Sequence, residues 1–211
     1  MFYKKAFSLT EVLLTLVIIG VIAAMMIPSV LSDVEKRRNI ESWKNLYSEV
    51  AQATNLVMLD NSGSLVDVCT SWDDNCLRDK YKKYMNVMKS CDESGNLGVC
   101  WHPNDNSSKM LDGEGINWWS SSSGLIQSNG SFVNFNFTSN DCSSTYGTLN
   151  TCGFILVDVN GFGKPNVLGK DIFQIWLLKY GVKPRGVDDG YQNSCNSNSS
   201  GWSCAAEYMY N

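Results

Sequence analysis

The apolar residues near the N-terminus of this chain form one long, almost uninterrupted run. Between Val12 and Leu31 the exceptions are Thr15, Gly20, Pro28 and Ser29. A helix needs about 20 mainly apolar residues to cross the hydrocarbon core of a bilayer. The pattern therefore predicts one transmembrane helix close to the start of the chain.

After Leu31 the apolar residues become periodic, at steps of three and four positions. The stripe consists of Ile40, Trp43, Tyr47, Val50, Thr54 and Val57, and Leu46, Ala53 and Met58 widen it. This period indicates an amphipathic helix that buries one face. We therefore predict one helix from about Ser8 to Leu59, gently kinked at Pro28, where a backbone hydrogen bond is lost. Its second half is expected to be the core element of a folded head.

A connection follows, from residue 64 to about residue 120. It is expected to contain one short helix that begins after an N-cap at Asp73 or Asp74. The apolar residues that share the predicted face of this helix are Leu77, Tyr81, Tyr84, Met85 and Met88.

From Leu125 onward the apolar period changes to two, which predicts β-strands. We expect a hairpin within 125–138, and further strands at 153–159 and 172–177. From Gly181 the chain is rich in Gly, Ser and Asn, which is typical of a loop-forming tail. The order of elements predicts an α+β fold, in which the long helix packs on an antiparallel sheet with disulfide-closed loops.

Composition limits the classes of protein to which the chain can belong. Its 211 residues suffice for the anchor helix and one domain of roughly 150 residues. The net charge of −4 gives no support for nucleic-acid binding, which needs clustered Lys and Arg. All eight cysteines follow the apolar run, so an oxidising compartment is expected.

One ionisable residue stands at the start of the apolar run. Glu11 follows two basic residues, Lys4 and Lys5. The positive-inside bias leaves these lysines in the cytoplasm and the rest of the chain outside. A lone carboxylate is costly in lipid, so Glu11 is a candidate functional residue.

The residues around Glu11 resemble the type IV prepilin signature. The likeness rests on a short basic leader, the small residue Ala6, Phe7, and Glu11 four positions after Phe7. Pro28 stands where this family often carries a helix-kinking proline. The family usually has Gly where this chain has Ala6, and an apolar residue where it has Thr10.

The resemblance implies a processing and assembly route. A membrane prepilin peptidase would cleave between Ala6 and Phe7, the Phe7 amine would be methylated, and the mature chain would join other pilin subunits in a helical filament on a pilus assembly platform. Before assembly it would be a single-pass protein of the bacterial cytoplasmic membrane, and afterwards part of an extracellular pilus or an envelope-spanning pseudopilus. The implied segments are a leader (1–6), a transmembrane assembly half of the helix (7–31), an amphipathic half (32–59) and an extracytoplasmic head (60–211).

Phe7 and Glu11 can interact electrostatically during assembly. In the mature chain the Phe7 amine and the Glu11 carboxylate lie one helical turn apart. In a bundle of staggered identical helices, the amine of one subunit can pair with Glu11 of its neighbour. Such a pair offsets part of the desolvation cost and sets the axial register. Phe7, Glu11 and, by resemblance, Pro28 are therefore the predicted assembly residues.

Two other interpretations of the N-terminus stay open. A cleaved secretory signal would use the small residues Val21-Ile22-Ala23, against a usual core of about 7–15 residues. A plain signal anchor would carry an extracellular binding or enzymatic domain that never polymerises. Among polymerising subunits, the large head with its long connection leans toward a surface-exposed pilus subunit rather than a secretion pseudopilin.

The cysteines are expected to form disulfides rather than a zinc site. No two of them have the C-x₂-C spacing of a zinc ligand pair. Sequence does not choose among the possible pairings. We expect sequential bonds, each closing one short polar loop: Cys69–Cys76, Cys91–Cys100, Cys142–Cys152 and Cys195–Cys204.

One loop contains potential metal ligands. Asp158, Asn160 and Asp171 carry the oxygen ligands that Ca²⁺ takes, and some secretion pseudopilins hold calcium in such a loop. The full EF-hand pattern is missing, so we favour a hairpin loop whose Asp and Asn accept backbone hydrogen bonds. We otherwise expect no cofactor.

The sequence offers few residues that could form a catalytic site. His102 is the single histidine of the chain. It lies near Cys100, which suggests a thiol nucleophile, but oxidation of Cys100 with Cys91 would remove that chemistry. We therefore expect a structural subunit and not an enzyme.

Overall fold

The computed structural model describes residues 8–118, 122–191 and 194–210. The predicted processing residues Ala6 and Phe7 lie outside the described residues. The chain divides into two compact units, Met1–Arg38 and Asn39–Asn211. We call the first the anchor unit and the second the head, and describe each by itself.

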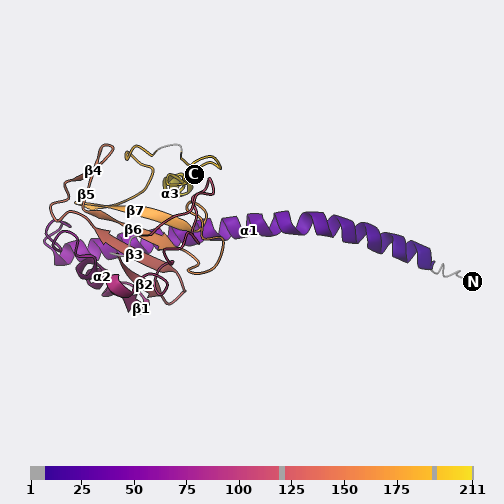
Figure 1. Cartoon of the computed structure of the whole chain (residues 1–211), viewed down its shortest axis with the longest axis horizontal. Helices are drawn as coiled ribbons and strands as arrows, with labels where there is room; N and C mark the ends of the chain where they lie inside the picture. The colour runs from indigo at the N-terminus through magenta and orange to yellow at the C-terminus, as the bar shows by residue number, and fades with distance from the viewer. Residues whose placement is uncertain (1–7, 119–121, 192–193, 211) are drawn as a thin grey trace, which may run out of the picture. The chain divides into compact units, whose positions relative to one another are not determined.

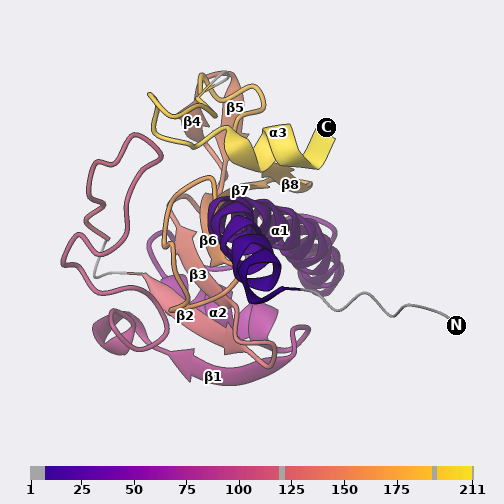
Figure 2. The same ribbon diagram turned by 90° about the vertical axis from the view of Figure 1, so that its right-hand side faces the viewer.

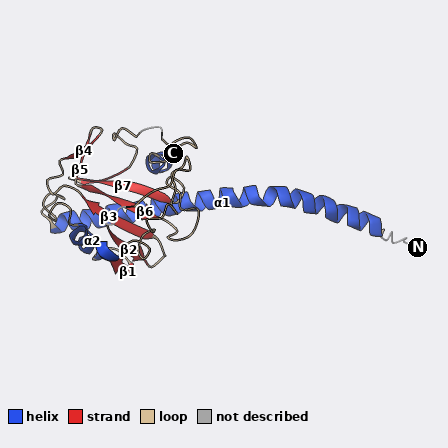
Figure 3. Ribbon diagram, in the orientation of Figure 1, coloured by secondary structure: helices blue, strands red, loops and turns tan. Residues whose placement is uncertain are grey.

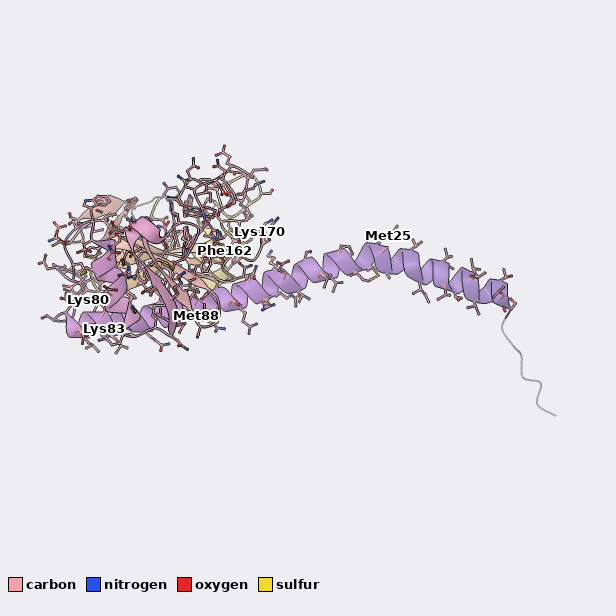
Figure 4. All side chains as sticks on the ribbon, turned by 60° about the horizontal axis from the view of Figure 1, so that its bottom comes forward. Met25, Lys80, Lys83, Met88, Phe162 and Lys170 are labelled. Carbon is pink, nitrogen blue, oxygen red and sulfur yellow. A yellow bond between two sulfur atoms is a disulfide. The ribbon has the colours of Figure 1, made fainter. Side chains whose placement is uncertain are left out.

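Helix α1 (Leu9–Asp60) contributes to both units. Its ends agree with the predicted helix to within one residue, and it continues through Pro28. In the anchor unit its large apolar side chains are exposed, as Met25 illustrates at 74 % exposure (Figure 4). The helix contains a window with a mean hydropathy of 2.5 in which no residue is buried, and it is long and apolar enough to cross a membrane.

The head is built on a six-stranded antiparallel sheet (Figures 1 and 3). The strand order is β1-β2-β3-β6-β7-β8, so neighbours along the chain are neighbours in the sheet except where a small hairpin intervenes. The sheet strands are β1 (Val87–Cys91), β2 (Ser123–Gln127), β3 (Phe132–Phe137), β6 (Gly153–Asp158), β7 (Ile172–Leu178) and β8 (Gly181–Pro184). The inserted hairpin consists of β4 (Ser144–Tyr146) and β5 (Leu149–Thr151).

The head half of α1 covers one face of this sheet (Figure 2). Phe135, Ile155 and Ile175 face one another across β3, β6 and β7, and none of them is exposed. Trp43 stacks on Phe173 with ring centroids 4.8 Å apart. This cluster contains the predicted amphipathic stripe except Ile40 and Thr54. The 3.6-residue period therefore identified the buried face of the helix correctly.

The other face of the sheet is covered by the long connection. A second core cluster joins residues of this segment to alternate residues of β3, β6 and β7. Trp101 lies edge-on to Trp118 and packs near Phe132, while Trp176 contributes from β7. Both faces of the central strands are therefore buried, and every residue of β6 is buried.

Three helical segments complete the head: α2 (Asp74–Lys82), the 3₁₀ turn Glu93–Gly95 and α3 (Cys204–Tyr210). Helix α2 begins after the predicted cap Asp73, whose carboxylate accepts the backbone N–H of Cys76 at 2.8 Å. It ends at Lys82, sooner than predicted, so Tyr84, Met85 and Met88 lie beyond it. Met88 lies instead in edge strand β1, at a register shift, and is 66 % exposed.

The tail also contains more regular structure than predicted. Strand β8 pairs with β7, and α3 buries Cys204, Ala205 and Ala206. These elements are short and their neighbours are Gly, Ser and Asn, so no hydrophobic periodicity in the sequence predicts them. Their stability comes from contacts with distant residues: the Trp43 indole N–H donates to Ala205 O at 3.0 Å.

Candidate functional site: the N-terminal signature and the buried carboxylates

The first turn of α1 is closed by a reciprocal pair of hydrogen bonds. The Glu11 backbone N–H donates to Ser8 Oγ at 3.2 Å, and Glu11 Oε2 accepts the Ser8 backbone N–H at 2.9 Å. This is a capping box, which satisfies helix donors that otherwise lack partners. Glu11 thus has a local role in starting the helix, in addition to the assembly role predicted from the sequence.

The same carboxylate has no basic partner among residues 8–118, 122–191 and 194–210. Its described contacts are with Ser8 alone, and its side chain is exposed within the anchor unit. Pairing with the amine of a mature Phe7 stays a prediction, because Phe7 lies outside the described residues.

Residues 1–27 match the family model of the prokaryotic N-terminal methylation motif. The chain carries the type IV pilin and pseudopilin signature. The match lies within the anchor unit and covers none of the head. The description of the head therefore comes from the structure alone. No curated protein and no solved structure matches the chain.

The signature and the structure agree on the architecture of a pilin-like protein. A long apolar N-terminal helix, an antiparallel sheet and four disulfides are all present. The bonds join consecutive cysteines along the chain: Cys69–Cys76, Cys91–Cys100, Cys142–Cys152 and Cys195–Cys204. Because Cys100 is bonded to Cys91, it offers no thiol beside His102.

The β6–β7 loop is organised by the two aspartates that the sequence singled out. Both Asp158 and Asp171 are fully buried. Asp171 accepts the backbone N–H groups of Val167 at 2.7 Å and Asn166 at 2.8 Å. Asp158 accepts the backbone N–H of Asn160 at 3.0 Å. The loop therefore has the contacts expected of a hairpin loop whose carboxylates accept hydrogen bonds from backbone amides.

The donor set of this loop fits calcium poorly. All four carboxylate oxygens of Asp158 and Asp171 already carry a protein partner. The amide oxygens of Asn160 and Asn166 are buried without one, but Ca²⁺ takes six to eight oxygen ligands. Among the described residues, no three His, Cys, Asp or Glu side chains are grouped to hold a metal ion.

His102 occupies a place that the sequence did not predict. Its Nε2 lies 2.8 Å from Asp158 Oδ2, and both side chains are buried. Phe162 lies on the β6–β7 loop and is half exposed (Figure 4). Its ring meets the His102 ring edge-on, with centroids 5.7 Å apart. Burial raises the pKa of Asp158 to about 7, although the hydrogen bond from His102 works in the opposite direction.

Another buried carboxylate, that of Asp74, connects α2 to the sheet. Asp74 Oδ1 accepts the backbone N–H of Phe137 in β3 at 2.6 Å, and Asp74 O accepts the hydroxyl of Ser123 in β2. Burial raises the pKa of Asp74 to about 7. From the sequence, Asp74 was predicted only as a helix cap. His102–Asp158 and Asp74–Phe137 join residues more than 50 positions apart, so no local pattern reveals either pair.

Proposed function

We propose that the mature chain is a polymerising subunit of a type IV pilus or a related pseudopilus. In this proposal prepilin peptidase removes residues 1–6, and the anchor helix passes from the membrane into a filament of identical subunits. The observation that carries the proposal is the combination of the signature in residues 1–27 with an anchor helix whose apolar side chains are exposed all round. Such a surface needs a lipid or protein environment.

Glu11 supplies the specificity of assembly in this proposal. A carboxylate transferred into an apolar bundle needs a partner, and the new amine at Phe7 is one turn away. The pair would form between neighbouring subunits and set their axial stagger. The capping box with Ser8 holds the carboxylate in place before assembly.

The decisive experiment compares Glu11→Ala with Glu41→Ala. Glu41 is an exposed acid on the head half of the same helix, so it is a matched control. Removing one partner of a buried ion pair costs about 3–5 kcal/mol. We therefore expect Glu11→Ala to be processed normally but to reduce the yield of sheared filaments at least about tenfold, whereas Glu41→Ala leaves the yield unchanged.

Mass spectrometry of the mature N-terminus completes the test. The proposal expects a chain that begins at a methylated Phe7. A retained Met1 would indicate a signal anchor, and a start at Ala24 would indicate a secretory signal. Normal filament yield from Glu11→Ala would contradict the proposed role of Glu11 but not the proposal that the chain polymerises. Within this proposal the filament is a surface pilus, which requires abundant subunit in the sheared fraction rather than confinement to the envelope.

A further inference from the structure

A tryptophan stands out on the surface of the head. Trp72 is 69 % exposed, whereas Trp43, Trp101, Trp118 and Trp176 are buried in the two core clusters. Burying an indole is strongly favourable, so an indole left in water within a well-packed domain needs a reason. The position of Trp72, in the loop closed by Cys69–Cys76, supplies further evidence.

The backbone of Trp72 adopts a conformation that bulky residues avoid. Its φ is +65°, in the left-handed region that favours Gly and Asn. The surrounding structure holds this conformation, because the Trp72 N–H donates to Phe137 O at 2.7 Å. A strained residue persists only where its surroundings determine it, and such residues gather at functional sites.

The loop that carries Trp72 is locked to the loop after β3. Ser71 Oγ donates to Asn140 Oδ1 at 3.0 Å and accepts the Asn140 backbone N–H at 2.9 Å. Asp67 reinforces the contact, since its N–H donates to Asn140 O and its carboxylate accepts the Asn140 side-chain amide at 2.7 Å. The indole is therefore presented on a rigid base, and binding to it would cost little ordering of the loop.

The other exposed side chains of the two joined loops are all polar. Within residues 67–76 and 138–145 the other exposed side chains are Asp67, Thr70, Ser71, Asp141, Ser143 and Thr145. Anchors of protein interfaces are normally clustered with other anchors and ringed by residues that exclude water. A single aromatic face beside hydroxyl and carboxylate groups instead suits a ligand with one apolar face and many hydroxyl groups.

The charge of the surface narrows the ligand class. In the two loops that carry Trp72 and its border, residues 67–76 and 138–145, the exposed ionisable side chains are both acidic, Asp67 and Asp141. An anionic ligand, such as a phosphate-rich or uronic-acid polymer, would be repelled. A sugar ring has an apolar C–H face that stacks on an indole, and hydroxyl groups that carboxylates and amides bind.

We propose that Trp72 is the stacking platform of a site for neutral carbohydrate, with Asp67, Ser71 and Asn140 as its polar border. One stacked ring binds weakly. Repetition of the site on many linked subunits would raise the overall affinity through effective concentration. The site itself does not depend on assembly, so it is tested on unassembled protein.

The test measures binding of neutral hexasaccharides to the full mature chain in a polyoxyethylene detergent, which carries no sugar headgroup. Cellohexaose, maltohexaose and N-acetylchitohexaose are the probes, and an oligogalacturonate is the charged comparison. We expect at least one neutral probe to bind. Trp72→Asn, whose new residue tolerates the left-handed backbone, should weaken it at least about tenfold.

Two variants separate stacking from folding. Trp72→Tyr retains an aromatic face and should bind within about threefold of the unaltered chain. Tyr180→Ala removes another aromatic residue, 71 % exposed on the β7–β8 turn, and should bind normally. Circular dichroism of each variant reports whether the head remains folded.

Several results would overturn the proposal. These are no binding of any neutral probe, binding that Trp72→Asn leaves unchanged, and stronger binding of the oligogalacturonate. Self-association of the chain that Trp72→Asn abolishes, measured by sedimentation in the same detergent, would assign Trp72 to a protein interface instead. None of these results bears on the filament proposal, which Glu11 tests separately.

Discussion

The two halves of α1 form one helix with two kinds of surface. In the anchor unit, apolar residues such as Leu13, Ile18 and Met25 are exposed on every side. In the head, Trp43, Leu46 and Val50 are buried along one stripe. A helix that is apolar all round needs lipid or other helices, whereas a striped helix needs only one partner surface. The head can therefore be stable by itself, and the anchor requires an environment outside the chain.

The largest difference between the two halves is expected when one large apolar residue in each is replaced and the free energy of unfolding is compared. Trp43→Ala removes the stack on Phe173 and the hydrogen bond to Ala205 O, and it leaves a cavity. We expect it to lower the free energy of unfolding of the head by about 3–5 kcal/mol. Leu13→Ala in the anchor half should leave that free energy unchanged. Urea unfolding of the full chain in detergent, followed by near-ultraviolet circular dichroism, measures both.

Equal losses from Trp43→Ala and Leu13→Ala would contradict the comparison. That result would mean that the anchor half contributes to the core of the head. An unchanged m-value in both variants is the control that the same surface unfolds in each.

A smaller effect is expected from pH, and it should arise in the head. Burial raises the pKa of Asp74 to about 7 from 3.8. Between these values the native state holds a proton that the unfolded state has lost, so the free energy of unfolding falls as pH rises. Asp74→Asn keeps an oxygen that accepts the Phe137 N–H, but it carries no charge. At pH 8 we expect this variant to be more stable than the unaltered chain by about 1–3 kcal/mol.

Urea unfolding at pH 4 and pH 8 checks this expectation. The advantage of Asp74→Asn should shrink toward zero at pH 4, where the native carboxyl is already neutral. Glu41→Gln, an exposed substitution on the head half of α1, is the control and should show no such pH-dependent gain. A gain of the same size at both pH values would assign the effect to packing instead of charge.

The smallest effect is expected from removal of divalent cations. The carboxylates of Asp158 and Asp171 are already bound by His102 and by backbone amides. A cation that bound only the native head would raise its melting temperature. We therefore expect EDTA and millimolar calcium to give the same melting temperature within about 1 °C. A clear rise with calcium that Asp171→Asn removes would show that the loop holds a cation.

The parts of the fold that were predictable are those with a strong local period. The limits of α1, the cap at Asp73, and the strands around Val133 and Ile155 all follow from patterns of 3.6 or two residues. Strand β1 was missed because its bulge breaks the alternation at Met88. Helix α3 was missed because seven residues carry too little signal.

The candidate sites divide in the same way. The prepilin signature is a contiguous motif, so the order of residues along the chain is enough to indicate Glu11 and the expected cleavage site. The His102–Asp158 pair and the Asp74–Phe137 contact depend on strands from distant parts of the chain. The exposure of Trp72 is likewise a property of packing: among the described tryptophans, Trp43, Trp101, Trp118 and Trp176 are buried, and local sequence does not distinguish Trp72 from them.

By itself the sequence determined the anchor, its orientation signals, the amphipathic half of α1 and the oxidised cysteines, since these depend on composition and local periodicity. Tertiary structure alone decided which polar groups are buried together and which aromatic residues face water. The physical reason is that burial and charge pairing depend on distances in space. Residues such as His102 and Asp158 lie 56 positions apart in the chain, yet meet at 2.8 Å in the fold.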